Sequence, residues 1–166
     1  MHEFYENPLC GRYAGEEMKR LFSDDVKFST WRKLWIALAE SEKELGLDIT
    51  DAQISQMKEH IYDIDYDSAA RHEGEVRHDV MAHVLTYGEA CPLAKPIIHL
   101  GATSCYVGDN TDIIRMRDGL IIIRRLLVSA IKALYDFADE YTPPPTLAYT
   151  PLHAAHIAAG ARMVDF

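Results

Sequence analysis

The segment from His99 to Asp112, HLGATSCYVGDNTD, contains the residues best suited to bind an anionic group. Gly101 lets the backbone approach a ligand closely, and Thr103 and Ser104 supply two neighbouring hydroxyls. A turn that leads into a helix exposes backbone amides, and with the hydroxyls these form a concavity for an anion. The alternative is an ordinary glycine turn in which Thr and Ser cap the next helix, because such turns are common.

A second group of polar residues, Arg77, His78 and Asp79, lies earlier in the chain. Valines at positions 76, 80 and 84 predict a helix here, and successive side chains on a helix point about 100° apart. The three polar groups are therefore expected to fan over the face opposite the valines. Arginine offers a planar donor fork, histidine exchanges its proton near neutral pH, and Asp79 is placed to orient the imidazole. The alternative is a solvated helix face with an ordinary mixture of charges.

A third group, Gly11-Arg12-Tyr13, lies near the N-terminus. Arg12 beside Tyr13 in a loop flanked by glycine can hold a phosphate through charge and hydrogen bonds. A tripeptide of this kind is uninformative when taken alone.

The histidines do not indicate a metal site. His78 and His83 are five residues apart, whereas a helical zinc pair needs a spacing of four, and no HExxH motif is present. We therefore expect neither a metal nor another cofactor.

Together, four segments in this order resemble the adenylosuccinate lyases of the fumarase/aspartase superfamily. They are GRYA, WRKLWIALAESEKELGL, RHDVMAHV and HLGATSCYVGDNTD, and the resemblance extends over roughly residues 5–150. It implies an all-α fold: a small N-terminal helical domain over residues 1–105, and over 106–166 the truncated start of a central helical bundle. The same resemblance implies a homotetramer.

The resemblance also implies an activity, the elimination of fumarate from adenylosuccinate, which gives AMP, and from succinyl-aminoimidazole carboxamide ribotide in purine biosynthesis. Such a reaction needs a base, an acid and donors that stabilise an aci-carboxylate intermediate. Transferred by position, Arg12 and Tyr13 would hold the nucleotide phosphate. The substrate site would be lined by Arg77, His78 and Asp79, with His78 in a supporting role, and the succinyl carboxylate would be bound by Thr103 and Ser104.

The sequence departs from this family at its end. The second family signature, T-H-x-Q-x-A-Q, carries the general acid on its histidine, but the matching stretch here is TPLHAAH, with Pro151 at the acid position. The third signature, GSS-x-x-MP-x-K-x-N with the serine base, is absent. No catalytic residue is thus intact, and we expect the short chain to be inactive alone.

The sequence leaves two other functions open. The first is a non-catalytic module that binds AMP-like nucleotides or assembles with a full-length lyase. The second is a sister lyase of the superfamily with another amino-acid substrate, which the matches at Arg12-Tyr13 and Arg77-His78-Asp79 disfavour.

The helices that position these residues are predicted from the spacing of apolar side chains along the sequence. A stripe that includes Trp31, Trp35 and Leu38, broken only by Glu42, predicts a helix capped by Ser29 or Thr30 and ended by Gly46. Thr50 and Gln53 form a capping box for a helix through about Ile61. The helix of the valine stripe should end near Gly88.

The second half of the chain is predicted to contain one long helix. Residues 92–108 contain two prolines and two glycines and should form a loop. Asp109 or Asn110 then caps a helix to about Tyr141, which three prolines at 143–145 terminate. Its apolar residues cover several faces and so require neighbours, which predicts self-association. The alanine-rich stretch 146–166 indicates helix only weakly.

Composition limits the range of functions. The chain has 166 residues, 48% of them hydrophobic, and a net charge of −9, which disfavours binding to nucleic acid or an anionic membrane. No apolar stretch approaches the ~20 residues needed to cross a bilayer. Three cysteines without a CxxC pair are typical of a reducing compartment, so a cytoplasmic protein is expected.

Overall fold

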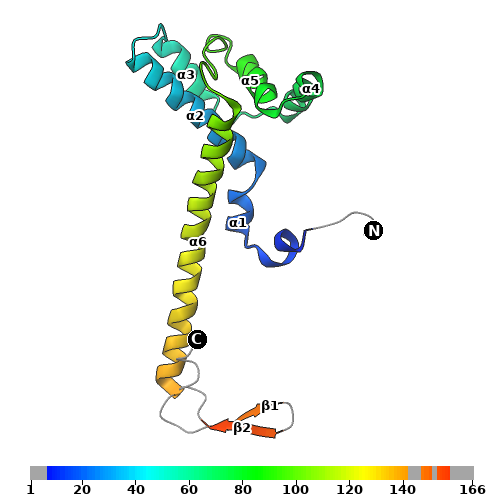
Figure 1. Ribbon diagram of the computed structural model, residues 1–166, viewed down its shortest axis with the longest axis vertical. Helices are drawn as coiled ribbons and strands as arrows, with labels where there is room; N and C mark the ends of the chain where they lie inside the picture. Colours follow the sequence, from blue (N-terminus) through cyan, green and yellow to red (C-terminus); the bar gives the residue numbers. More distant parts are fainter. Residues whose placement is uncertain (1–6, 142–146, 151–152, 158–166) are drawn as a thin grey trace. The chain divides into compact units, whose positions relative to one another are not determined.

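The computed structural model describes residues 7–141, 147–150 and 153–157. The chain divides into two compact units, residues 1–118 and residues 119–166. The elements are η1 (Leu9–Tyr13), α1 (Glu16–Leu21), α2 (Asp24–Glu44), α3 (Asp51–Glu59), α4 (Tyr66–Val76), α5 (Asp79–Ala90), α6 (Ser104–Tyr141), β1 (Leu147–Thr150) and β2 (His153–Ile157) (Figure 1). The predicted all-α class is confirmed, with one short pair of strands in addition. The domain boundary expected after residue 105 remains a proposal.

Helix α2 begins earlier than predicted. Its N-cap is Ser23, whose hydroxyl accepts a hydrogen bond from the amide of Val26 at 3.4 Å. The predicted caps, Ser29 and Thr30, lie buried inside the helix and donate to the Val26 carbonyl. Two aspartates in the first turn favour the earlier start, because they complement the positive end of the helix dipole. The predicted end is confirmed, since Gly46 has a φ of +94°.

Helix α3 begins with the predicted capping box. The Thr50 hydroxyl accepts from the amide of Gln53, and the Gln53 side chain accepts from the amide of Thr50 at 2.9 Å. The helix ends at Glu59, slightly before the predicted Ile61. It packs against α2.

The prediction of one continuous helix through Arg77, His78 and Asp79 is wrong. Arg77 ends α4 in the left-handed conformation, with φ 54° and ψ 37°. His78 is the N-cap of α5, and its Nδ1 accepts from the amide of Met81 at 3.3 Å. Asp79 is the first residue of α5. The left-handed residue redirects the chain, so the three side chains stand at a corner instead of on one helix face. Helix α5 ends at Ala90, just beyond the predicted Gly88.

The long helix α6 also begins earlier than predicted. It starts at Ser104, so Gly108, Asp109 and Asn110 lie within it and do not form a loop and cap. The side-chain Nδ2 of Asn110 donates to the Tyr106 carbonyl at 2.7 Å, an interaction inside the helix. Residues 92–101 form successive turns, and the helix ends at Tyr141 as predicted.

Residues 147–150 and 153–157 form an antiparallel pair, not the weak helix expected there. Leu147 pairs with Ile157, and Thr150 pairs with His153. The alanine-rich stretch has no helical apolar stripe, and Tyr149 and Thr150 are residue types that favour strands. Pro151 lies outside the described residues.

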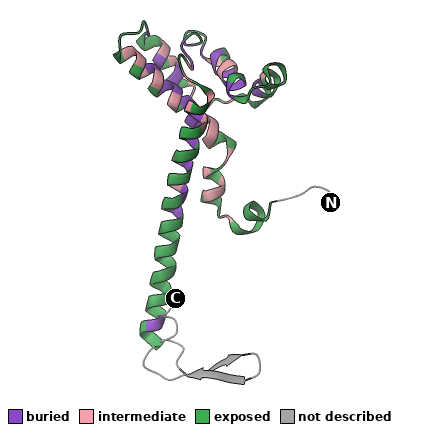
Figure 2. Cartoon of the chain, viewed as in Figure 1, coloured by how far each residue is buried: buried purple, intermediate pink, exposed green. Residues whose placement is uncertain are grey.

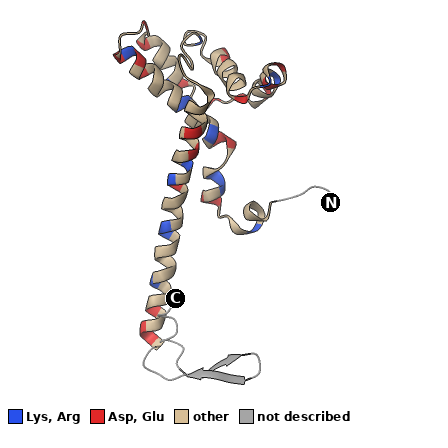
Figure 3. Cartoon of the chain, viewed as in Figure 1, with Lys and Arg blue, Asp and Glu red and all other residues tan. Residues whose placement is uncertain are grey.

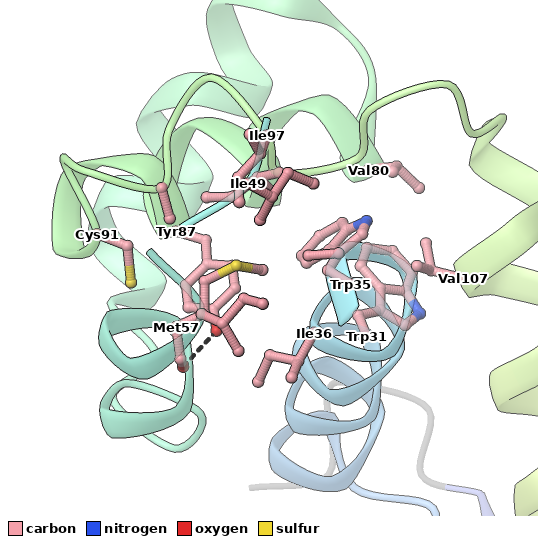
Figure 4. Packing of buried hydrophobic residues seen from close by; sticks show 14 residues of the cluster. Trp31, Trp35, Ile36, Ile49, Met57, Val80, Tyr87, Cys91, Ile97 and Val107 are labelled. Atoms are coloured by element: carbon pink, nitrogen blue, oxygen red, sulfur yellow. Dashed lines mark hydrogen bonds between the residues drawn. The ribbon is translucent and has the colours of Figure 1, made fainter. Parts of the chain in front are cut away.

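One apolar cluster organises the first unit, as Figures 2 and 4 show. Trp31, Trp35 and Ile36 extend from α2 toward Met57 of α3 and Tyr87 of α5. The Tyr87 hydroxyl donates to the Met57 carbonyl, the dashed line in Figure 4. This bond joins α5 to the end of α3 within the apolar interior, where an unpaired polar group is costly.

Most side chains of α6 within residues 119–134 are exposed, although many of them are apolar. Among the described residues, this part of the helix therefore lacks the neighbours that its sequence requires. Figure 3 shows few charges along this stretch. The exposed apolar residues there are Leu120, Ile121, Ile123, Leu126, Leu127, Val128, Ile131 and Leu134.

The Tyr87 hydroxyl provides a first test of the packing. We expect Tyr87→Phe to lower the free energy of unfolding by about 1–3 kcal/mol, because the buried Met57 carbonyl loses its donor. Urea denaturation followed by tryptophan fluorescence measures the change. Tyr62→Phe is the matched control, since Tyr62 is 72% exposed and its loss should have little effect. Equal stabilities of the two variants would refute the structural role of the bond.

The ring of His83 provides a second test. It stacks on Phe28 with centroids 3.7 Å apart, and burial, followed by the charges of Arg32 and Lys27, lowers its pKa from 6.5 to about 4. Between pH 6.5 and about 4, the His83 side chain therefore binds a proton in the unfolded chain but not in the folded chain. Stability should fall as pH drops from about 6.5 toward 4, by at most about 3 kcal/mol. In His83→Phe this part of the pH dependence should vanish, as thermal melts at several pH values would show; an unchanged slope would contradict it.

Candidate functional site

The turn before α6 is held in an unusual backbone conformation. His99 and Gly101 both have a φ of 65°, in the left-handed region that residues other than glycine rarely adopt. The Trp35 indole donates to Nδ1 of His99 at 2.9 Å, and the Ala102 amide donates to the His99 carbonyl at 3.3 Å. Within the described part of the chain, the amides of Gly101 and Thr103 donate to no backbone acceptor. They are thus available to a ligand.

His78 and His99 bring two of the predicted segments together. Burial lowers the pKa of His99, and the charge of His78 lowers it further. A lowered pKa agrees with the geometry, because Nδ1 of His99 must be unprotonated to accept from Trp35. The corner at residues 77–79 therefore lies close enough to the turn for the two histidines to interact electrostatically.

Asp79 and Ser104 line the same hollow. Its volume is about 340 Å³, and its walls include Lys27 and Trp31 of α2 and Arg115 of α6. Ser104 is half-buried at the start of α6, and Thr103 beside it is exposed. The hydroxyls, the free amides and the positive end of a long helix are together suited to hold a carboxylate.

Arg77 is exposed at the same corner. In the described residues its guanidinium forms no hydrogen bond or ion pair, so the donor fork is free for a ligand. The left-handed backbone at this position ends α4 immediately before the N-cap of α5.

Arg12 and Tyr13 are not brought to this group by any described contact. Both lie exposed in η1, and the Arg12 guanidinium lies 5.5 Å from the centroid of the Tyr13 ring. The two residues form a cation–π pair of their own. A phosphate role for them remains a prediction.

Glu42 stood out in the sequence as a charged residue in an apolar helical stripe, but the sequence indicated no role for it. It interrupts the apolar stripe of α2, and burial raises its carboxyl pKa. Its Oε2 is buried without a hydrogen-bond donor among the described residues, and its Oε1 lies 3.7 Å from the point that a Cβ on Gly101 would occupy. The carboxyl thus packs under the turn. Lys27 and Trp31 were also missed as site residues, because an ordinary lysine and a stripe tryptophan give no signal in a sequence.

The described residues contain no group of three or more His, Cys, Asp or Glu side chains placed to hold a metal ion. They also include no helix long and apolar enough to cross a membrane.

Two of the similar curated proteins are adenylosuccinate lyases. The lyase of Saccharomyces cerevisiae is 51% identical over 159 residues, which cover 94% of this chain and 33% of the yeast protein. The lyase of Schistosoma mansoni is 50% identical over 93% of this chain and 33% of its own length. The chain thus spans about a third of the length of these relatives. No family model matches it.

Solved structures show the same fold. A 3-carboxy-cis,cis-muconate lactonizing enzyme from Pseudomonas putida has a TM-score of 0.80 at 22% identity, and the match covers 96% of this chain and 38% of that enzyme. A fumarate lyase from Mesorhizobium sp. BNC1 has a TM-score of 0.77 at 22% identity, over 98% of this chain and 38% of its own. These findings confirm the resemblance seen in the four motifs: the chain corresponds to an N-terminal portion of the adenylosuccinate lyases.

Proposed function

We propose that this chain supplies part of the substrate site of an adenylosuccinate lyase, which eliminates fumarate from adenylosuccinate and from succinyl-aminoimidazole carboxamide ribotide. The observation that carries the proposal is the turn at residues 99–104, with its unpaired amides and hydroxyls beside the Arg77–Asp79 corner. The similarity to adenylosuccinate lyases over most of the chain supports it.

Each part of the reaction makes a different demand. The aci-carboxylate intermediate needs donors aimed at its oxygens, and Thr103, Ser104 and the free amides are of this kind. Arg77 offers a fork for a second anionic group, and Arg12 with Tyr13 offers one for the phosphate. A proton must also reach the leaving nitrogen, and Pro151, at the position of the family's acid, has none to give. We therefore expect this chain to bind the nucleotide and not to turn it over alone.

Arg77 gives the most direct test of the binding site. Adenylosuccinate should raise the melting temperature of the purified chain without releasing fumarate. Arg77→Asn should weaken binding by about tenfold or more in calorimetry, because a charged donor pair is lost, and asparagine tolerates the left-handed backbone. Arg117→Asn, at an exposed position of α6, is the control. Equal affinity of the Arg77 variant and wild type would argue against the site, and steady fumarate release would refute the assigned loss of the acid.

A second candidate function, a module that assembles with copies of itself or with a longer lyase, is favoured by the exposed apolar faces of α6. We propose that the chain self-associates through these faces, with the tetramer of the family as the expected assembly. A chain whose three cysteines are all free thiols also fits a reducing compartment, and we propose a cytoplasmic location.

If the chain self-associates through α6, a single charged substitution on an apolar face of this helix should lower the mass of the oligomer. Leu127 is 56% exposed on α6, and Leu127→Glu should reduce the oligomer observed by light scattering, since a carboxylate buried in an apolar contact is unfavourable. Arg124→Glu, another exposed position of the same helix, should have a smaller effect. A wild-type chain that is monomeric and stays in solution at high concentration would exclude this assembly.

A further inference from the structure

The hollow beside Asp79 and Ser104 is also lined by residues that have no role in the proposed substrate site. On α2 this wall consists of Lys27 and Trp31, and on α6 it includes Asp109, five residues after Ser104. Lys27 is half-buried and Asp109 is exposed. The two residues come from elements more than 80 positions apart in the sequence, so only the fold places them at one hollow.

Two donors of this wall lack acceptors. The Lys27 ammonium lies 5.1 Å from the ring centroids of both Phe28 and Trp31 and forms no ion pair within the described residues. The Trp31 side chain is 2% exposed, and its Nε1 is buried without an acceptor there. Figure 4 shows this nitrogen on the side of the ring that faces Val107 of α6, away from the centre of the cluster.

The charges of the hollow indicate which chemical group it suits. Its charged groups are the cations of Lys27 and Arg115 and the carboxylates of Asp79, Asp109 and Asp112, which gives one net negative charge. Arg115 is engaged, because its Nε donates to the Leu21 carbonyl at 3.1 Å and its Nη1 lies 3.9 Å from Asp112. A dianionic phosphate would meet net repulsion from these carboxylates, whereas the single carboxylate of the proposed site is assigned to the hydroxyls and amides of the turn. A neutral group whose hydroxyls both donate to a carboxylate and accept from an ammonium would meet no such repulsion.

We infer that Lys27 and Asp109 form a subsite for a vicinal diol, in which one hydroxyl accepts from the Lys27 ammonium and another donates to the Asp109 carboxylate. The inference rests on the proposed function, since the ligand class of that site is a ribonucleotide, and the ribose carries such a diol. It assigns the sugar to the hollow and leaves the anionic groups of the ligand to the turn and to the arginines.

The test compares AMP with 2′,3′-dideoxy-AMP by isothermal titration calorimetry on the full chain. Lys27→Met keeps the aliphatic stem over the aromatic rings and removes only the charged donor. It should weaken AMP binding about tenfold and leave the affinity for 2′,3′-dideoxy-AMP unchanged. Lys33→Met is the matched control, because Lys33 lies on the same helix over another aromatic ring, 5.3 Å from the centroid of Tyr62. It should change neither affinity.

Each result bears on the inference. Loss of AMP affinity in Lys27→Met, but not in Lys33→Met, with no effect on the dideoxy ligand supports the subsite. Equal weakening of both ligands, or no weakening of either, overturns it while the proposed function stands. A wild-type chain that binds neither AMP nor adenylosuccinate overturns the proposed function as well. Melting curves of each variant show whether a lost affinity reflects a lost fold.

Discussion

The hydrogen bond from the Trp35 indole to Nδ1 of His99 is the interaction on which the candidate site depends. A residue other than glycine in the left-handed conformation costs on the order of 1–3 kcal/mol, so His99 needs compensation from its surroundings. Trp35 is 1% exposed in the apolar cluster, so it offers the bond from a fixed position. With His99 held, the chain turns at Gly101 and leaves the start of α6 facing the corner at residues 77–79. The packing of α2 thus determines the geometry of a turn more than 60 positions later.

The same helix contributes to the site on its other faces. Phe28 and Trp31 hold the neutral ring of His83, which lies one helical turn after Asp79 on α5. Lys27 and Trp31 form a wall of the hollow that Asp79 and Ser104 share. Three segments that are distant in sequence therefore meet on one scaffold helix, an arrangement that holds binding groups more firmly than loops alone would.

The parts of this fold that sequence patterns predicted are those governed by local chemistry. Gly46 ends α2 because glycine adopts a positive φ without strain, and Thr50 with Gln53 opens α3 because their side chains satisfy each other's amides. The errors fall where the tertiary structure prevails over residue type. Arginine is not a residue type that favours the left-handed conformation, and histidine is an uncommon N-cap. The break between α4 and α5 could therefore not be predicted from the sequence. Helix α6 opens at Ser104 although Gly108 follows, and the amide of Tyr106 already donates to the Thr103 carbonyl at 3.0 Å.

The motifs indicated part of the candidate site, and the roles of its residues remain predictions. Asp79 and Ser104 were identified from their motifs and are brought to one hollow, with Thr103 beside it, whereas Arg12 and Tyr13 have no described contact with it. Lys27 could not have been found, since its significance comes from the elements that surround it. Glu42 had a signal, a single charge in an apolar stripe, but its position under Gly101 became visible only in three dimensions.

The corner at residues 77–79 and the turn at residues 99–104 are proposed to form one nucleotide site. A titration of the isotopically labelled chain with adenylosuccinate, followed by amide chemical shifts in NMR spectra, tests this proposal most directly. The largest shifts should cluster at Arg77–Asp79 and Gly101–Ser104, with smaller ones at Lys27 and Asp109. Saturable shifts confined to other parts of the chain, with both of these segments unmoved, would contradict it.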